Sequence, residues 1–206
     1  MKETIILKSI SPEIYPDLEI ECLVINNDQI TNYVTTIPEE RKIVASKTAK
    51  VKARRGNPGE IIQTVLKVNV NGYEYILQEE TTEVKLRDIN DGSQKTDIVV
   101  KNINSTSNEE YVVKYVKFIE MYTSACTSGA CHCGALACYT PNDEPRQLAQ
   151  VDENIIILTA WGSKAICLAG SYIVTYNAEE NDYNTLEKGA FESTYTVAEK
   201  PRKLIK

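Results

Sequence analysis

Residues 61–77 read IIQTVLKVNVNGYEYIL, and this stretch decides the fold class. Two apolar runs of strand length, Ile61–Val70 and Tyr73–Leu77, flank the pair Asn71-Gly72. Both turn residues tolerate a positive φ, which is what the commonest two-residue hairpin turn requires. The stretch therefore predicts an antiparallel β-hairpin.

Apolar residues elsewhere in the chain also occur in short runs. Long stretches with the 3.6-residue period of a helix are scarce, whereas Tyr, Val, Ile and Thr are plentiful. The fold class that we predict is α+β, mostly β, with short helices. Further strands are expected at Thr4–Leu7, Leu18–Val24, Ile98–Lys101, Glu110–Lys114, Ile155–Ala160 and Tyr172–Tyr176.

The composition is that of a globular protein. The 206 residues carry a formal charge of −6, with 42% hydrophobic and 25% charged residues, which excludes collagen, coiled coil and wholesale disorder. This length allows one large domain or two small ones. No apolar run approaches the roughly 18 residues that a membrane span needs. Charges interrupt the N-terminus before any signal-peptide core, so we expect a cytoplasmic protein without a membrane partner.

An internal repeat is the most informative feature of the organisation. The chain contains two Phe, Phe118 and Phe191, and each is followed four residues later by a Tyr and preceded by another Tyr. The first copy spans residues 97–122 and the second spans residues 171–195. An aromatic pair at i and i+4 fits one face of a short helix. Each copy is therefore predicted to be strand, polar turn, strand and short helix.

The second copy resembles the small PGDYG-type domain of phage and bacterial proteins. The resemblance rests on residues 169–195, with Ala169-Gly170-Ser171-Tyr172 entering a strand and Phe191-Glu192-Ser193-Thr194-Tyr195 closing the unit. Ala169 and Ser171 stand where the family has Pro and Asp. The family has no settled chemistry, so the resemblance implies a fold unit and a phage-related context, and it transfers no catalytic residue.

These observations divide the chain into three parts. We expect an N-terminal β-rich unit at 1–123, a Cys-rich insertion at 124–143 and a C-terminal PGDYG-like unit at 144–206. The insertion contains four of the six cysteines within 13 residues, as C-x4-C-x-C-x4-C with the single His of the chain, His132, at its centre. The four cysteines are Cys126, Cys131, Cys133 and Cys138.

Four closely spaced thiols suit a structural zinc ion, since thiolates are preferred ligands of closed tetrahedral zinc sites. The spacing differs from common zinc motifs. We expect Cys131 and Cys133 to share one metal only if the chain turns at His132. An iron–sulfur cluster, disulfides and free thiols are the alternatives. Cys22 and Cys167 lie in apolar patterns and are expected to be buried.

A basic stretch precedes the hairpin. Residues 41–55 hold seven Lys and Arg and no acid, and they lead into the loop Gly56-Asn57-Pro58-Gly59. Backbone N–H groups in such a loop, next to two Arg, can hold a phosphate or a carboxylate. The basic loop 47–59 is thus a candidate site for a small anion or nucleic acid, with Lys50, Lys52, Arg54 and Arg55 as the binding residues. The alternative is a solvated edge strand protected by lysines.

An enzyme is the less favoured class, because the single His lies inside the Cys cluster. The leading hypothesis is a non-enzymatic binding protein, phage-related, with a protein partner and a structural zinc site. The alternatives are an anion or nucleic-acid binder that uses the basic loop, and a metal-dependent enzyme.

Overall fold

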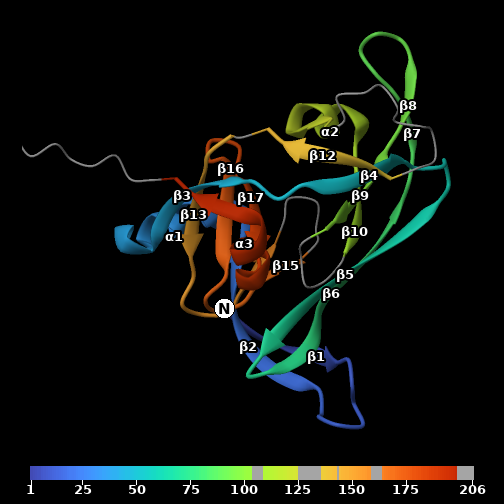
Figure 1. Ribbon diagram of the computed structural model, residues 1–206. Coiled ribbons are helices and arrows are strands. Elements are labelled where there is room, and N and C mark those ends of the chain that lie inside the picture. Colours follow the sequence, from blue (N-terminus) through green and yellow to red (C-terminus); the bar gives the residue numbers. More distant parts are fainter. Residues whose placement is uncertain (104–108, 125–135, 143, 159–163, 199–206) are drawn as a thin grey trace, which may run out of the picture. The chain divides into compact units, whose positions relative to one another are not determined.

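The computed structural model describes residues 1–103, 109–124, 136–142, 144–158 and 164–198 (Figure 1). The strands up to residue 103 are β1 (Lys2–Ser9), β2 (Leu18–Asn26), β3 (Lys42–Lys47), β4 (Val51–Arg55), β5 (Ile61–Val70), β6 (Tyr73–Glu83), β7 (Leu86–Asp88), β8 (Gln94–Thr96) and β9 (Ile98–Asn102). The later strands are β10 (Glu110–Val113), β11 (Tyr122–Ser124), β12 (Ala137–Pro141), β13 (Arg146–Gln150), β14 (Ile155–Leu158), β15 (Lys164–Cys167), β16 (Tyr172–Asn177), β17 (Asp182–Leu186) and β18 (Tyr195–Val197). The helices are α1 (Ile30–Thr36), α2 (Tyr115–Met121) and α3 (Lys188–Thr194), with 3-10 turns η1 (Asn27–Gln29) and η2 (Glu39–Arg41).

The predicted hairpin is confirmed. β5 and β6 pair antiparallel, and Val70 lies opposite Tyr73 across the turn. Asn71 and Gly72 have φ values of 54° and 88°, as a turn matching the right-handed strand twist requires. The other strands predicted from apolar runs are present as well, so the mostly β class is confirmed. The sequence patterns did not predict several strands of three to six residues, namely β3, β7, β8, β11, β12, β13, β15 and β18.

The chain forms two compact units that are interleaved in sequence. Unit 1 comprises Met1–Glu3, Cys22–Lys47 and Asp143–Lys206, and unit 2 comprises Thr4–Glu21 and Thr48–Asn142. The boundaries expected from the sequence were drawn at residues 123 and 143 and assumed continuous units. Those boundaries stay a prediction. In the structure, residues 22–47 belong to the same compact unit as the C-terminal part of the chain.

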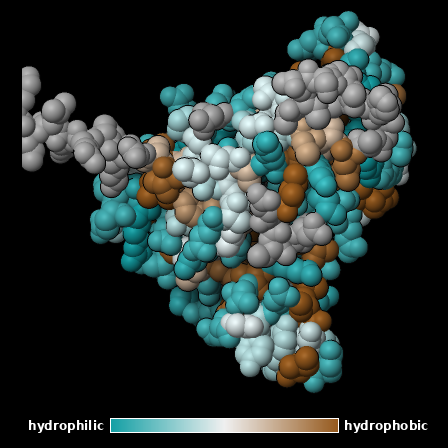
Figure 2. Space-filling model, viewed as in Figure 1, coloured by the Kyte–Doolittle hydropathy of each residue, from teal (hydrophilic) through white to brown (hydrophobic). Residues whose placement is uncertain are grey.

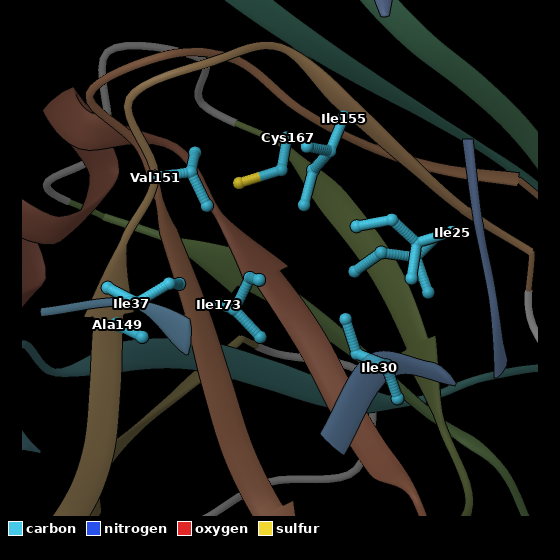
Figure 3. Packing of buried hydrophobic residues seen from close by; sticks show 9 residues of the cluster. Ile25, Ile30, Ile37, Ala149, Val151, Ile155, Cys167 and Ile173 are labelled. Carbon is cyan, nitrogen blue, oxygen red and sulfur yellow. The ribbon is translucent and has the colours of Figure 1, made fainter. Parts of the chain in front are cut away.

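Unit 1 contains a five-stranded antiparallel sheet with the order β17-β16-β13-β3-β18. α3 covers one face, where Phe191 packs against Ala45, Leu148 and Val174. A second cluster includes Ile30 of α1 and residues of β14 and β15, whose side chains point toward one another in Figure 3. β14 pairs with β15 and, in parallel, with residues 23–26 of β2.

Unit 2 contains the sheet β10-β9-β4-β12-β11, which is also antiparallel throughout. α2 covers one face, where Phe118 and Tyr122 pack against Val51, Ala53 and Val100. β5 and β6 extend as a long ribbon, and β1 adds to β6 (Figure 1).

The two five-stranded sheets have the same strand order and the same register. In each sheet the first two strands form a hairpin, β10 and β9 or β17 and β16. Two further strands follow, and the last strand of the sheet, β11 or β18, comes directly after the short helix in sequence. In unit 2 Lys52 lies opposite both Lys101 and Cys138, and in unit 1 Gln147 lies opposite both Thr175 and Val44. The fourth strand of each sheet, β12 or β3, directly precedes in sequence the third strand of the other sheet, β13 or β4. Each sheet thus takes its fourth strand from the segment that directly precedes the third strand of the other sheet.

Individual contacts repeat between the sheets. Gly56 N–H donates to the carbonyl of Asp97 at 3.0 Å, and Val151 N–H donates to that of Ser171 at 3.0 Å. Phe118 stacks on Tyr122 with ring centroids 5.0 Å apart, and Phe191 stacks on Tyr195 at 6.0 Å. The Phe and Tyr that mark each copy in the sequence therefore form the same ring contact beside each short helix.

Tyr111 and Tyr183 precede Phe118 and Phe191 by seven and eight residues in the sequence, and they occupy different positions in the two sheets. Tyr111 lies opposite Val100, whereas Tyr183 lies opposite Thr175, one register position further along. A shift of one residue moves a strand side chain to the other face. Tyr111 consequently packs beside Phe118, while the Tyr183 hydroxyl lies 2.9 Å from the Thr31 hydroxyl.

Candidate functional site

The basic residues of β4 alternate between the faces of the unit 2 sheet. Val51 and Ala53 are buried in the core, whereas Lys52 is exposed on the opposite face. Arg54 follows Lys52 on that face and is half-buried. Arg55 comes two residues after the buried Ala53, so it lies on the same face as Ala53 and on the other face from Lys52. The predicted alternation of cations with packed residues is confirmed, but the four predicted anion-binding residues do not share one face.

Arg54 is engaged by a carboxylate of the chain itself. Its Nη1 donates to Glu60 Oε2 at 2.9 Å, and its Nη2 donates to Glu60 Oε1. The backbone N–H of Asn57 adds a third donor to Glu60 at 3.0 Å. These hydrogen bonds, with that from Arg54 first, lower the pKa of Glu60 to about 2. The glycine loop thus holds a carboxylate, as its composition suggests, but the carboxylate belongs to Glu60.

The remaining backbone donors of the loop also bond within unit 2. Gly56 N–H donates to Asp97 O, and Gly59 N–H donates to Val84 O at 2.9 Å. A Cβ on Gly56 would lie 2.6 Å from Val84 Cγ1, so only glycine lets the loop approach this buried valine. Binding of an external anion by this loop stays a prediction. The hydrogen bonds within the loop make it less favourable, because they already use Arg54 and the backbone N–H groups.

One cross-strand row on the Lys52 face combines a thiol with cations. Across β12, β4 and β9, Cys138 lies opposite Lys52, and Lys52 lies opposite Lys101. Lys101 in turn lies opposite Glu110 of β10, with Nζ and Oε1 3.5 Å apart. Directly opposite residues have Cβ atoms about 4.5–5.5 Å apart. We call these four residues the Cys138 row. Lys101 was not predicted as a site residue, since it joins the row only through strand pairing.

The cysteine segment begins and ends on paired strands. β11 and β12 are antiparallel neighbours, and Ser124 lies opposite Tyr139. Cys126 comes two residues after Ser124 in the sequence, and Cys138 directly precedes Tyr139. Cys138 is a half-buried free thiol. Cys126, Cys131, Cys133 and His132 lie outside the described residues.

Cys22 and Cys167 are buried free thiols in unit 1, as predicted. Burial raises the pKa of Cys167 to about 12, and it also raises that of Cys22, with Glu3 adding to the effect. Both thiols are therefore kept protonated, and their role is packing. Within the ranges that the structure covers, no group of three or more His, Cys, Asp or Glu side chains forms a metal site.

Large exposed hydrophobic side chains are spread over many elements. In Figure 2 the hydrophobic residues of the visible face form separate groups among hydrophilic ones. Scattered hydrophobic residues of this kind are normal on a protein surface. The exposed residues include Ile6, Ile14, Val44, Ile61, Tyr73, Leu86, Val116 and Ile119. Among the described residues, no helix is long and apolar enough to cross a membrane.

Comparisons with protein-family models, with curated proteins and with solved structures found no match for this chain.

Proposed function

We propose that this chain is a non-enzymatic binding protein that carries a structural zinc ion bound by Cys126, Cys131, Cys133 and Cys138. The observation that carries the proposal is the pairing of β11 with β12. Because Ser124 lies opposite Tyr139, the chain enters and leaves the cysteine segment on adjacent strands. The four cysteines lie within 13 residues of a segment whose two ends are held together by this strand pairing.

A closed loop lowers the entropy that metal binding has to overcome. Bringing the ends of a flexible segment together is unfavourable, and in this hairpin the strand pairing already provides that closure. Zinc favours the thiolate form and orders the segment that binds it. Thiolate ligands favour zinc over the harder divalent cations. A closed four-thiolate site has a structural rather than a catalytic role.

The binding role is proposed from the architecture of two related units. The matching strand order, the matching register and the repeated Phe–Tyr pair support a duplication of one β unit. The PGDYG-like pattern at 169–195 supports a phage-related context. We propose a protein as the partner, because the anion-binding loop is occupied by Glu60.

The test is elemental analysis of anaerobically purified protein together with a free-thiol count. We expect about one zinc ion per chain, since four thiolates complete one tetrahedral site. The variants Cys131→Ser and Cys138→Ser should lose the zinc ion. Cys167→Ala is the matched control, because it removes a buried thiol of unit 1 and should retain the metal.

Metal-free protein with four titratable thiols in the segment would contradict the proposal. Zinc that is retained in Cys131→Ser and in Cys138→Ser would contradict this choice of ligands.

A further inference from the structure

The turn between β5 and β6 places an asparagine directly before a glycine. Asn71 and Gly72 lie at the end of the β5–β6 ribbon, and both are exposed to solvent (Figure 1). No other Asn in the sequence is followed by Gly. Because glycine has no side chain, its backbone nitrogen can approach the side-chain carbonyl of the preceding residue without steric hindrance. The turn therefore combines an amide electrophile with a neighbouring backbone nucleophile.

The electrophile is unengaged at Asn71. Its side chain makes no hydrogen bond to any residue that the structure describes. The turn between β7 and β8 offers the closest comparison, since Asp91 precedes Gly92 there. Asp91 Oδ1 accepts a hydrogen bond from Ser93 N–H at 2.8 Å, and the carboxylate is ionised at neutral pH. An ionised carboxylate is a poor electrophile, so Asn71 is the more reactive of the two residues.

The nucleophile is held by the turn. Gly72 N–H donates to Asn69 Oδ1 at 2.9 Å. The φ values of Asn71 and Gly72, 54° and 88°, are those of a type I′ turn. To reach Cγ of Asn71, the Gly72 nitrogen has to lose its proton and rotate about the Cα–C bond of Asn71. That rotation breaks the hydrogen bond to Asn69 and leaves the turn conformation, so the folded turn slows the reaction.

We propose that Asn71 is a deamidation site of this protein and that the hydrogen bond from Gly72 N–H to Asn69 Oδ1 sets its rate. The deprotonated Gly72 nitrogen bonds to Asn71 Cγ, the Cγ–Nδ2 bond breaks, and ammonia leaves. Water then opens the cyclic imide at either carbonyl, which gives aspartate or isoaspartate at position 71. Asn69 is a positioning residue, since it acts through the turn. The proposal does not depend on the zinc site.

The products change an exposed aromatic surface of unit 2. Tyr73 follows the turn and is 48% exposed, and its ring centroid lies 4.7 Å from that of Tyr15. Either product adds a negative charge next to this pair of rings. Isoaspartate also inserts a methylene group into the backbone of a two-residue turn, which disturbs the pairing of Val70 with Tyr73. Deamidation would therefore alter this end of the ribbon with time.

The experiment incubates the full chain at mildly alkaline pH and follows position 71 by peptide mapping with mass spectrometry. The folded wild type should deamidate more slowly than the same chain unfolded in guanidinium chloride. Folded Asn69→Ala should react about fivefold faster than folded wild type, the rate equivalent of about 1 kcal/mol for one hydrogen bond. Asn69→Asp keeps an acceptor oxygen and should react at the wild-type rate.

Two controls separate this hydrogen bond from a general loosening of the ribbon. Tyr15→Phe removes the hydrogen bond from the Tyr15 hydroxyl to the Glu74 carbonyl, 2.6 Å long, and should leave the rate unchanged. Asn181 is an internal control, because it also has a positive φ, 51°, but precedes Asp182 and accepts a hydrogen bond from the Thr31 hydroxyl. It should stay intact. Amide spectra verify that each variant keeps its fold.

Equal rates in folded wild type and Asn69→Ala would overturn the role of Asn69. The same acceleration in Tyr15→Phe would also overturn it, because the hydrogen bond to Asn69 would then have no specific effect. A folded wild type that keeps Asn71 intact while Asn69→Ala does so as well would overturn the site itself.

Discussion

At the residue scale, Glu60 explains why Arg54 of the basic loop is engaged by the chain itself. Its carboxylate accepts hydrogen bonds from Arg54 and from the backbone of Asn57. An intramolecular carboxylate is always at hand, whereas an external anion has to overcome the entropy of association. The loop is therefore stabilised by the interaction that its composition suggested for a ligand.

This pairing predicts a dependence of stability on pH. Because the pKa of Glu60 is lowered from its ordinary value of 4.5 to about 2, its contribution is present above about pH 4.5 and is lost as the pH falls toward 2. Glu60→Gln should reduce the free energy of unfolding at pH 7 by about 1 kcal/mol, and by less at pH 3. Denaturant unfolding at both pH values measures the difference.

Arg54→Gln removes the other partner and serves as the control. It should show the same loss and the same dependence on pH, and the double variant should add little to either change. A destabilisation by Glu60→Gln that stays constant between pH 7 and pH 3 would be inconsistent with this account.

At the scale of elements, α2 and α3 are equivalent helices with different N-termini. Glu187 precedes α3, and its side chain accepts a hydrogen bond from Ala190 N–H at 2.9 Å. Lys114 precedes α2 and makes no side-chain cap. Both helices have seven residues, which is too short for an isolated helix to be stable in water. Capping and packing therefore decide whether they form.

The difference in capping predicts unequal effects of the same substitution. Glu187→Ala should lower the free energy of unfolding by about 1 kcal/mol, because the cap hydrogen bond and a favourable charge at the helix start are both lost. Lys114→Ala, the matched control at the equivalent position, should change it by less than about 0.5 kcal/mol. Thermal or denaturant unfolding compares the two. Equal losses would show that the cap does not distinguish the helices.

At the scale of the whole molecule, the exchange of β3 and β12 determines where the chain can be divided. β12 lies between β4 and β11, and its Tyr139 contacts Phe118 with ring centroids 4.9 Å apart. A fragment that ends before β12 loses both the strand that pairs with β11 and part of the unit 2 core. The divisions at residues 123 and 142 are therefore not interchangeable.

Fragments 1–123 and 1–142 test this difference directly. The longer one contains every strand of the unit 2 sheet and should unfold cooperatively with a dispersed amide spectrum. The shorter one should show neither property. Residues 22–47 lack their unit 1 partners in both fragments, so the comparison isolates the contribution of residues 124–142. Cooperative unfolding of 1–123 would contradict the role assigned to β12.

The sequence by itself determined the properties that depend on neighbouring residues. The Asn71-Gly72 turn, the strand-length apolar runs, the buried Cys22 and Cys167, and the alternation along β4 all follow from local backbone chemistry and the period of two. The aromatic pairs at i and i+4 likewise predicted the two short helices.

Only the tertiary structure decided which distant residues meet. The pairing of Cys138 with Lys52 and of Lys52 with Lys101 depends on strand register, as does the separation of Tyr111 from Tyr183. The exchange of β3 and β12 between the sheets is likewise invisible in either copy alone. Register and strand order are set by the packing of whole faces against one another, because a slip of one residue would expose every buried side chain of a strand.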